Sequence, residues 1–536
     1  MPKSRVVLII FDGWGIGPKY QGNAIANANT PTFDSLSLAF PHTQLEAAGQ
    51  AVGLPKDEDG NTETGHLNLG AGRIVYQDLP RINMGIANGS FFQNKAFLKA
   101  ISHVKTNNSN LHLLGLIGQG GVHSVNDHLY ALLNLAKNHN LNQVYLHLIT
   151  DGRDSPPTSS PHYLDQVQQT INTLGVGQIS TVMGRYYAMD RDHRWERTQV
   201  AYEALINGVG ESTTDLQGSM AKRHAQQETD EFIKPIIINP TRIKSNDAVV
   251  FFNYRIDRPR QLTKALVLDD ATFSKHTDSF DPYAIKYQAS HLQEKQGPEK
   301  IFPRTNLPQN LCFVTMTEYE KNLPVEIAYP PEFVEMPLSR VVALAGKRQL
   351  KLSESEKERF VTYYFNGQRE LPFPGEDVQI TPSPKVPTYD LKPEMSGEEQ
   401  TRKLLAAIKS PLYDLIVINY ANPDMVAHTG NYDATVKACE YVDGWLKQIY
   451  QTVMHTPGVT MLLTADHGNA EELINLKTGN VDTEHSYFPV PLLIVGQDFQ
   501  GKRVRLRQGV LGDVAPTILK IMGLNQPSSM TGRALL

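Results

Sequence analysis

Six residues with metal-binding side chains stand near the two ends of the 536-residue chain, close to short apolar runs. They are Asp12, Asp424, His428, Asp466, His467 and His485. Three carboxylates and three imidazoles suit two borderline divalent ions such as Mn²⁺ or Zn²⁺ better than Ca²⁺. Taken singly, an Asp after a strand is often a helix N-cap and a His is often structural. The six together predict a two-metal site, which can clamp a phosphoryl group.

A hydroxyl that could act as a nucleophile lies in "DEDGNTETGHLNLGAGR", residues 57–73, where Thr62 is followed by Glu63 and His66. The structural interpretation is a turn or cap hydroxyl in a loop rich in Gly, Asn and Asp. In the functional interpretation, the glycines let the backbone approach a phosphate at the start of a helix. Because the chain also carries a predicted two-metal site, we favour Thr62 as the nucleophile.

The middle of the chain carries a different set of residues, which is rich in arginine. Its members are His123, Arg153, Asp154, Arg185, Arg191, Arg255 and Arg258, and they too come directly after apolar runs. Arginine recognises carboxylate and phosphate groups through paired hydrogen bonds. A single surface arginine is usually in a solvated salt bridge. The convergence of the group predicts a pocket for a small polyanion.

The elements that must position both sets are short runs rich in Val, Ile and Leu, separated by helical patterns. Such runs are typical of a parallel sheet covered by helices on both faces, where ligands bind at the carboxyl ends of the strands. We predict an α/β protein with two domains. One consists of residues 1–76 and 310–536, and the other, residues 77–309, is inserted in it. The polar segment 294–310, which holds three prolines, is the expected return linker.

The composition limits the partners and the location of the protein. The net charge of −5 favours neither a nucleic-acid nor a membrane partner. Two cysteines without metal spacing, and a first apolar run of six residues without a signal-peptide pattern, indicate a cytoplasmic protein.

Nine motifs in order along the chain resemble those of cofactor-independent (2,3-bisphosphoglycerate-independent) phosphoglycerate mutase, in the alkaline phosphatase superfamily. They include "FDGWGIG", "GNTETGHLNLGAGR", "GGVHS", "DGRDSPP", "GRYYAMDRDHRWER", "NYRIDRPRQL", "NYANPDMVAHTGNYD" and "TADHGNAEE". The resemblance implies an alkaline-phosphatase-like core with an inserted α/β transferase domain. It implies a monomer that interconverts 3-phosphoglycerate and 2-phosphoglycerate in glycolysis and gluconeogenesis without 2,3-bisphosphoglycerate.

The resemblance also implies roles for individual residues. It places one Mn²⁺ on Asp424, His428 and His485, and a second on Asp12, Thr62, Asp466 and His467, with Zn²⁺, Co²⁺ or Mg²⁺ as alternatives. It places phosphoglycerate on His123, Arg153, Asp154, Arg185, Arg191, Arg255 and Arg258. Lys357, in "SESEKERFVTYYFNG", matches the family's active-site lysine. Thr62 would carry the phosphoryl group, and Asp154 would act as general acid and base.

The sequence departs from the family pattern in three places. Thr62 stands where the family has a serine, and Gln119 stands where an aspartate is usual ahead of "GGVHS". The residues "ERF" after Lys357 also differ from the usual aromatic residue and histidine. Because relatives in the superfamily use threonine, phosphopentomutase or a phosphatase is an alternative. A catalytically silent binder of phosphorylated metabolites is a second alternative, with Thr62 as the disabling change.

Overall fold

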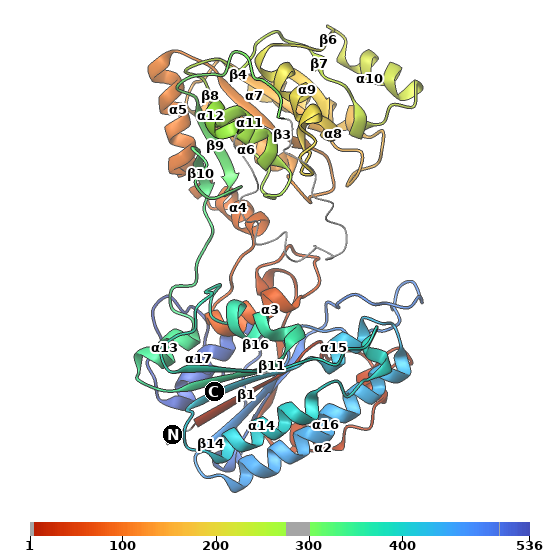
Figure 1. Ribbon diagram of the computed structural model, residues 1–536, viewed down its shortest axis with the longest axis vertical. Coiled ribbons are helices and arrows are strands. Elements are labelled where there is room, and N and C mark those ends of the chain that lie inside the picture. Colours follow the sequence, from red (N-terminus) through yellow and green to blue (C-terminus); the bar gives the residue numbers. More distant parts are fainter. Residues whose placement is uncertain (1–4, 275–300, 503) are drawn as a thin grey trace. The chain divides into compact units, whose positions relative to one another are not determined.

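The computed structural model describes residues 5–274, 301–502 and 504–536 of the chain (Figure 1). The chain divides into two compact units, each built on one sheet. Unit 1 comprises Met1–Pro80 and Glu332–Leu536, and unit 2 comprises Arg81–Pro331.

Unit 1 contains an eight-stranded sheet whose strand order differs from the sequence order. The order is β12 (Glu376–Thr381), β11 (Gln349–Glu354), β13 (Leu415–Tyr420), β1 (Arg5–Phe11), β14 (Val459–Thr464), β15 (Val490–Val495), β2 (His42–Glu46) and β16 (Gly509–Val510). The strands from β12 to β14 are parallel, whereas β15 is antiparallel to both of its neighbours. The central strands are buried along almost their whole length, as expected for strands covered on both faces.

Helices cover both faces of this sheet (Figure 1). α1 (Ala24–Asn27), α2 (Pro31–Ala39) and α14 (Gly397–Lys409) pack against α16 (Tyr432–His455), and α15 (Asn422–Ala427) directly precedes α16. α13 (Leu338–Leu344) and α17 (Val514–Met522) pack against α3 (Thr62–Ala71). The apolar faces of these helices join the sheet in one large buried core.

Unit 2 contains a second eight-stranded sheet. Its order is β10 (Glu326–Tyr329), β9 (Cys312–Thr317), β8 (Ala248–Phe251), β3 (Leu111–Ile117), β4 (Val144–Thr150), β5 (Gln178–Gly184), β7 (Ile236–Ile237) and β6 (Glu211–Ser212). All neighbouring pairs are parallel except β5 with β7. Its helices are α5 (Lys95–Asn107), α6 (Asn126–Asn138), α7 (Ser160–Leu174), α8 (Arg185–Ala188), α9 (Trp195–Ile206), α10 (Leu216–Ala225), α11 (Pro259–Val267), α12 (Asp270–Ser274) and most of α4 (Asp78–Ala87).

The predicted α/β fold with two sheets is confirmed, but the boundaries of the inserted unit are not those predicted at 76/77 and 309/310. The chain returns to unit 1 after Pro331, because β9 and β10 extend the second sheet beyond residue 310. Residues 294–300 of the predicted return linker lie outside the described residues. Its remainder belongs to unit 2, where Phe302 is buried in the core.

Within the described part of the chain, no helix combines the length and the apolar character needed to cross a bilayer. Cys312 and Cys439 are both buried as free thiols.

Candidate functional site

Four neighbouring parallel strands of unit 1 bring the first predicted set together. β11, β13, β1 and β14 lie side by side in the sheet. Lys357 follows β11, Asp424 follows β13, Asp12 follows β1, and Asp466 follows β14. Parallel strands end at the same edge of a sheet, so side chains far apart in sequence meet there.

His485 reaches this edge in a different way, because it precedes its strand. β15 runs antiparallel to β14, so its beginning lies beside the end of β14. His485 therefore joins residues that follow the parallel strands. The ring centroids of His467 and His485 lie 3.9 Å apart.

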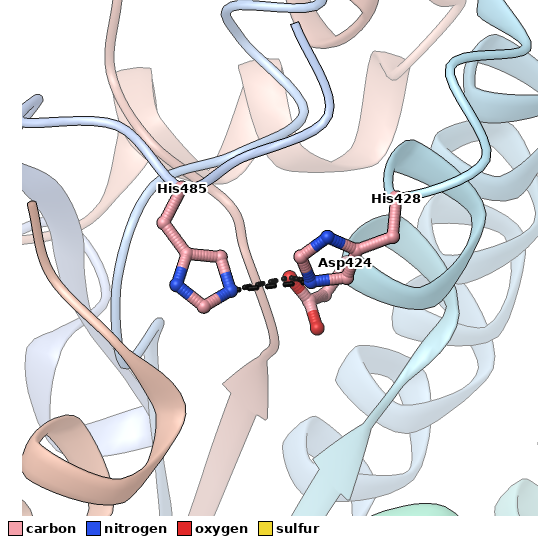
Figure 2. A group of neighbouring side chains, drawn as sticks. All are labelled: Asp424, His428 and His485. Carbon is pink, nitrogen blue, oxygen red and sulfur yellow. Dashed lines mark hydrogen bonds and ion pairs between the residues drawn. The ribbon is translucent and has the colours of Figure 1, made fainter. Parts of the chain in front are cut away.

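Asp424, His428 and His485 form a compact group of potential metal ligands (Figure 2). One ligand atom from each lies within 4.8 Å of the others. The Nε2 atoms of His428 and His485 lie 3.2 and 3.5 Å from Oδ1 of Asp424, and 3.2 Å from each other. A second group of the same kind consists of Asp12, Asp424 and His467, all of them buried.

The three histidines share one orientation. Nδ1 of His428 lies 2.7 Å from the carbonyl oxygen of Thr483, and Nδ1 of His485 lies 2.9 Å from that of Gly60. Nδ1 of His467 lies 3.1 Å from the carbonyl oxygen of Gly468. Because a carbonyl only accepts, each Nδ1 donates to it, which turns each Nε2 toward the carboxylates, where it can bind a metal ion in exchange for a proton. This is the usual arrangement of metal-binding histidines in proteins.

Thr62 lies beside both groups. It is the first residue of α3, whose N-cap Asn61 accepts a hydrogen bond from the backbone N–H of Thr64. Its Oγ1 atom lies 2.9 Å from Nε2 of His467 and 3.3 Å from Nζ of Lys357. The hydroxyl is therefore held at the start of a helix, close to predicted ligands and to a cation.

Lys357 is buried and contacts two carboxylates. Its Nζ atom lies 2.8 Å from Oδ1 of Asp12 and 2.7 Å from Oδ2 of Asp424. Burial alone would lower the pKa of Lys357, but Asp12, Asp424 and Asp466 outweigh it and hold the pKa above its usual value. The lysine therefore adds a permanent positive charge next to Thr62.

The buried carboxylates and imidazoles of unit 1 shift one another's pKa values. Burial would raise the pKa of Asp466, but His467, His66 and Lys357 lower it to about 2. Burial would likewise lower the pKa of His467, which Asp466, Asp12 and Asp424 raise to about 10. The carboxylates thus stabilise positive charge on neighbouring groups, as they would on a bound cation.

Two supporting residues were not predicted from the sequence. His66 lies four residues after Thr62 on α3, and its Nδ1 lies 3.1 Å from Oδ2 of Asp466. The side-chain amide of Asn419, at the end of β13, donates to Oδ2 of Asp12 at 2.6 Å and approaches Nε2 of His66 at 3.1 Å. His66 could have been predicted from its spacing of four residues, which places it on the same helix face as Thr62.

Unit 2 positions the second predicted set in the same way, on loops that follow neighbouring parallel strands. β8, β3, β4 and β5 are neighbours in the sheet and run parallel. The predicted residues follow these strands: His123 after β3, Arg153 and Asp154 after β4, Arg185 and Arg191 after β5, and Arg255 and Arg258 after β8. All seven therefore lie on connections at the carboxyl ends of adjacent strands.

Arg185 is the centre of this second site. Its Nη1 donates to Oδ1 of Asp151 and to Oδ2 of Asp154, both at 2.5 Å, and its Nη2 lies 3.0 Å from Nε2 of His123. Burial and the neighbouring Arg185 lower the pKa of His123 to about 4. Burial would raise the pKa of Asp154, but Arg185 and His123 hold it below its usual value. Asp154 is therefore ionised and His123 neutral near pH 7.

Asp151 was not predicted from the sequence, although it begins the motif "DGRDSPP". It is buried, and it accepts hydrogen bonds from the backbone N–H of Asp154 at 3.1 Å and from Oγ of Ser155 at 2.9 Å. Ser155 Oγ in turn accepts from the backbone N–H of Gln119 at 3.0 Å. Asp151 thus connects Arg185 with the loops that follow β3 and β4.

The other arginines are more exposed. Arg191 and Arg255 approach Asp257 at 2.7 and 3.4 Å. Arg258 donates to the carbonyl of Met189 at 3.2 Å. Its pKa is lowered, mainly by burial and to a smaller extent by neighbouring arginines. Arg153 is 55% exposed and lies 3.8 Å from Glu231. These guanidinium groups leave donor capacity for an anionic ligand.

Comparison with known proteins places this geometry in a family. A family model described as the BPG-independent PGAM N-terminus matches residues 82–321, which lie within unit 2. The 2,3-bisphosphoglycerate-independent phosphoglycerate mutase of Chloroflexus aggregans is 49% identical over 539 residues, covering 99% of this chain and 98% of that one. The chain belongs to the 2,3-bisphosphoglycerate-independent phosphoglycerate mutase family.

Other members of the family support the assignment. The Clostridium perfringens mutase is 46% identical over the full length of both chains. The crystal structure of Leishmania mexicana phosphoglycerate mutase at low cobalt concentration is 27% identical, with a TM-score of 0.55, and covers 100% of this chain and 98% of that one. The family predicted from the motifs is therefore confirmed.

Proposed function

We propose that this chain interconverts 3-phosphoglycerate and 2-phosphoglycerate through a phosphothreonine on Thr62, without 2,3-bisphosphoglycerate. The full-length relatives are named for this reaction and for its independence of bisphosphoglycerate. The observation that carries the proposal is the position of Thr62 Oγ1, 2.9 Å from Nε2 of His467 and 3.3 Å from Lys357. A nucleophile needs such neighbours to bind and neutralise an incoming phosphate.

We propose two divalent metal ions in unit 1, with Mn²⁺ as the preferred metal and Zn²⁺, Co²⁺ or Mg²⁺ as alternatives. The donor set fits such ions, because the Nε2 atoms of three histidines are turned toward buried carboxylates. Asp424, His428 and His485 would hold one ion, and Asp12, Thr62, Asp466 and His467 the other. When bound, the ions lower the pKa of a coordinated hydroxyl and offset negative charge on phosphoryl oxygens.

Thr62 acts as the nucleophile in the first half of the proposed reaction. Its hydroxyl loses its proton to water, and the alkoxide forms a bond to phosphorus while the bond from phosphorus to the glycerate oxygen breaks. Lys357, whose charge is fixed by Asp12 and Asp424, stabilises the negative charge on the phosphoryl oxygens. Asp154, which is ionised in the free protein near pH 7, would take up a proton from water and give it to the departing glycerate oxygen.

The second half reverses these steps with the other hydroxyl of glycerate. Asp154, now ionised, takes the proton of that hydroxyl, and the new alkoxide attacks the phosphothreonine. The bond from phosphorus to Thr62 Oγ1 breaks and the Thr62 alkoxide is restored. Arg153, Arg185, Arg191, Arg255 and Arg258, with His123, would hold the glycerate carboxylate in both halves.

We expect a cytoplasmic protein, because its two cysteines are free thiols, and a monomer, because the family resemblance implies one. Light scattering on the purified protein tests the oligomeric state. A mass of two chains would contradict this part of the proposal.

The activity is tested by comparing three substrates with the Mn²⁺-supplemented protein: 3-phosphoglycerate, ribose 5-phosphate and an aryl phosphate. We expect rapid turnover of 3-phosphoglycerate to 2-phosphoglycerate, because the arginine set of unit 2 suits a carboxylate. Preference for ribose 5-phosphate would identify a phosphopentomutase, and preference for the aryl phosphate a phosphatase. No turnover of any substrate would identify a silent binding protein.

A further inference from the structure

A buried carboxylate that is absent from the predicted set links the loops of unit 1 that carry potential ligands. Glu471 lies four residues after His467, and its side chain is fully buried. The backbone N–H groups of Gly15 and Asn469 each donate to its Oε2 atom at 2.9 Å. The hydroxyl of Ser486 donates to its Oε1 atom.

Each of these three donors belongs to a different loop. Gly15 lies in the loop that begins with Asp12, Asn469 follows His467, and Ser486 follows His485. One carboxylate therefore connects the segments after β1, after β14 and before β15. A buried carboxylate needs such donors, since it would otherwise be strongly destabilising.

The loops have the shape needed to surround this carboxylate. A Cβ atom added to Gly15 would lie 2.2 Å from Cδ of Glu471, and one added to Gly468 would lie 2.3 Å from its Oε1. Glycine at both positions lets the backbone come close enough to bond with the carboxylate. The close contact between the loop backbones and the Glu471 carboxylate therefore depends on the two glycines as well as on Glu471.

Asn469 extends the connection to a fourth segment. Its side-chain amide donates to Oδ1 of Asp424 at 2.8 Å, the same oxygen that faces His428 and His485. The backbone N–H of Ser486 also donates to the carbonyl of Gly468 at 2.9 Å. Residues from all the ligand-bearing segments of unit 1 except α3 are therefore connected to Glu471 directly or through Asn469.

We propose that Glu471 is a positioning residue of the metal site, which holds the ligand-bearing loops at the spacing that two divalent ions require. This inference rests on the proposed function, because it assumes that those loops bind metal. Glu471 would act through Asp12, His467, His485 and Asp424 and would not contact the substrate. Partners of this kind typically contribute about 10- to 100-fold to metal affinity.

The test compares Mn²⁺ binding by wild-type protein and three variants, each freed of metal by chelation and titrated calorimetrically. Glu471→Gln replaces one acceptor by an N–H donor that faces other donors, and we expect Mn²⁺ affinity to fall about 10- to 100-fold. Ser486→Ala removes a single donor and is expected to cause a smaller loss. Glu472→Gln is the matched control, because Glu472 accepts only from the backbone of Leu476, at 3.3 Å, among the contacts described.

A second readout separates positioning from general destabilisation. At high Mn²⁺ concentration, Glu471→Gln should recover activity, and its KM for 3-phosphoglycerate should equal that of wild type. Activity that stays low at saturating Mn²⁺, with normal Mn²⁺ affinity, would overturn the positioning role.

The outcomes distinguish this inference from the proposed function. If wild-type protein binds Mn²⁺ and Glu471→Gln binds it equally tightly, the role of Glu471 is wrong and the metal site stands. If wild-type protein binds no Mn²⁺, both the proposed metal site and the proposed role of Glu471 are wrong. If Glu471→Gln does not fold, Ser486→Ala decides, and unchanged Mn²⁺ affinity in that variant overturns the inference.

Discussion

The Oγ1 atom of Thr62 lies 2.9 Å from Nε2 of His467, although the two residues are 405 positions apart in the chain. His467 follows β14, whereas Thr62 begins α3. Nδ1 of His467 donates to the carbonyl of Gly468, so Nε2 is turned toward the threonine hydroxyl. The hydroxyl is therefore anchored beside a ligand site by both the helix start and the imidazole.

Two substitutions of Thr62 should distinguish the role of its hydroxyl from the role of its methyl group. Thr62→Ala removes the nucleophile, and we expect mutase activity and any phosphatase activity to fall below about one-thousandth of wild type. Thr62→Ser keeps Oγ and relieves the restriction that β-branching places on χ1, so its activity should equal or exceed that of wild type. Steady-state kinetics with 3-phosphoglycerate measures both. Wild-type turnover by the alanine variant would contradict the assignment.

The metal ligands should behave as a unit. His485→Ala leaves an ion with two of its three proposed side-chain ligands, so we expect at least about a 100-fold loss of activity and a lower metal content. Elemental analysis of the purified protein gives the metal content directly. His455→Ala, at the exposed end of α16, is the control and should match wild type. Full metal content in His485→Ala would show that His485 is not a ligand.

Asp151 should control substrate binding through Arg185. In Asp151→Asn, the bond from Arg185 loses its charge assistance, worth about 1.5–3 kcal/mol, and Arg185 is held mainly by Asp154 and His123. We expect the KM for 3-phosphoglycerate to rise about 10-fold or more, since ~1.4 kcal/mol corresponds to a factor of ten. Asp165→Asn, on the exposed side of α7, serves as the control. An unchanged KM would show that Asp151 does not position Arg185.

A buried glutamate near Lys357 should make stability depend on pH. Burial raises the pKa of Glu354 from 4.5 to about 7. Between these values the folded state binds more protons than the unfolded state, so the free energy of unfolding falls as pH rises and the penalty is complete above pH 7. Glu354→Gln removes this penalty, and relative to wild type it should gain up to about 3 kcal/mol between pH 5 and pH 8.

Urea denaturation at both pH values measures this gain, with Glu358→Gln on the exposed side of the same segment as the control. A difference between Glu354→Gln and wild type that is the same at pH 5 and pH 8 would contradict a raised pKa.

The fold class could be predicted, and the proposed site residues could be assigned to the edges of two sheets, because buried parallel strands leave a simple signal. Runs such as "VVLIIF" and "VTMLLT" are apolar throughout, and the polar residues after them mark the edge where ligands bind. The sequence does not indicate the order of the strands. Only tertiary packing places β11, β13, β1 and β14 side by side, and only the antiparallel direction of β15 brings His485 to them.

The features that were missed depend on contacts between distant segments. Glu471 and Asp151 are acidic residues inside motifs, and nothing in their spacing shows that they are buried or which N–H groups they accept from. The boundary at residue 310 was wrong because a polar segment with three prolines resembles a linker. The strands that follow it, β9 and β10, belong to the second sheet, which only their pairing partners reveal.

The most direct test of the central claim is to find the phosphate during turnover. Protein mixed with 3-phosphoglycerate and Mn²⁺ is quenched in acid within one turnover, digested and analysed by peptide mass spectrometry. A phosphothreonine should be detected on the peptide containing Thr62, at up to one phosphate per chain, and it should be absent from Thr62→Ala. Phosphate on another residue, or active protein that never carries phosphate, would contradict the phosphothreonine mechanism.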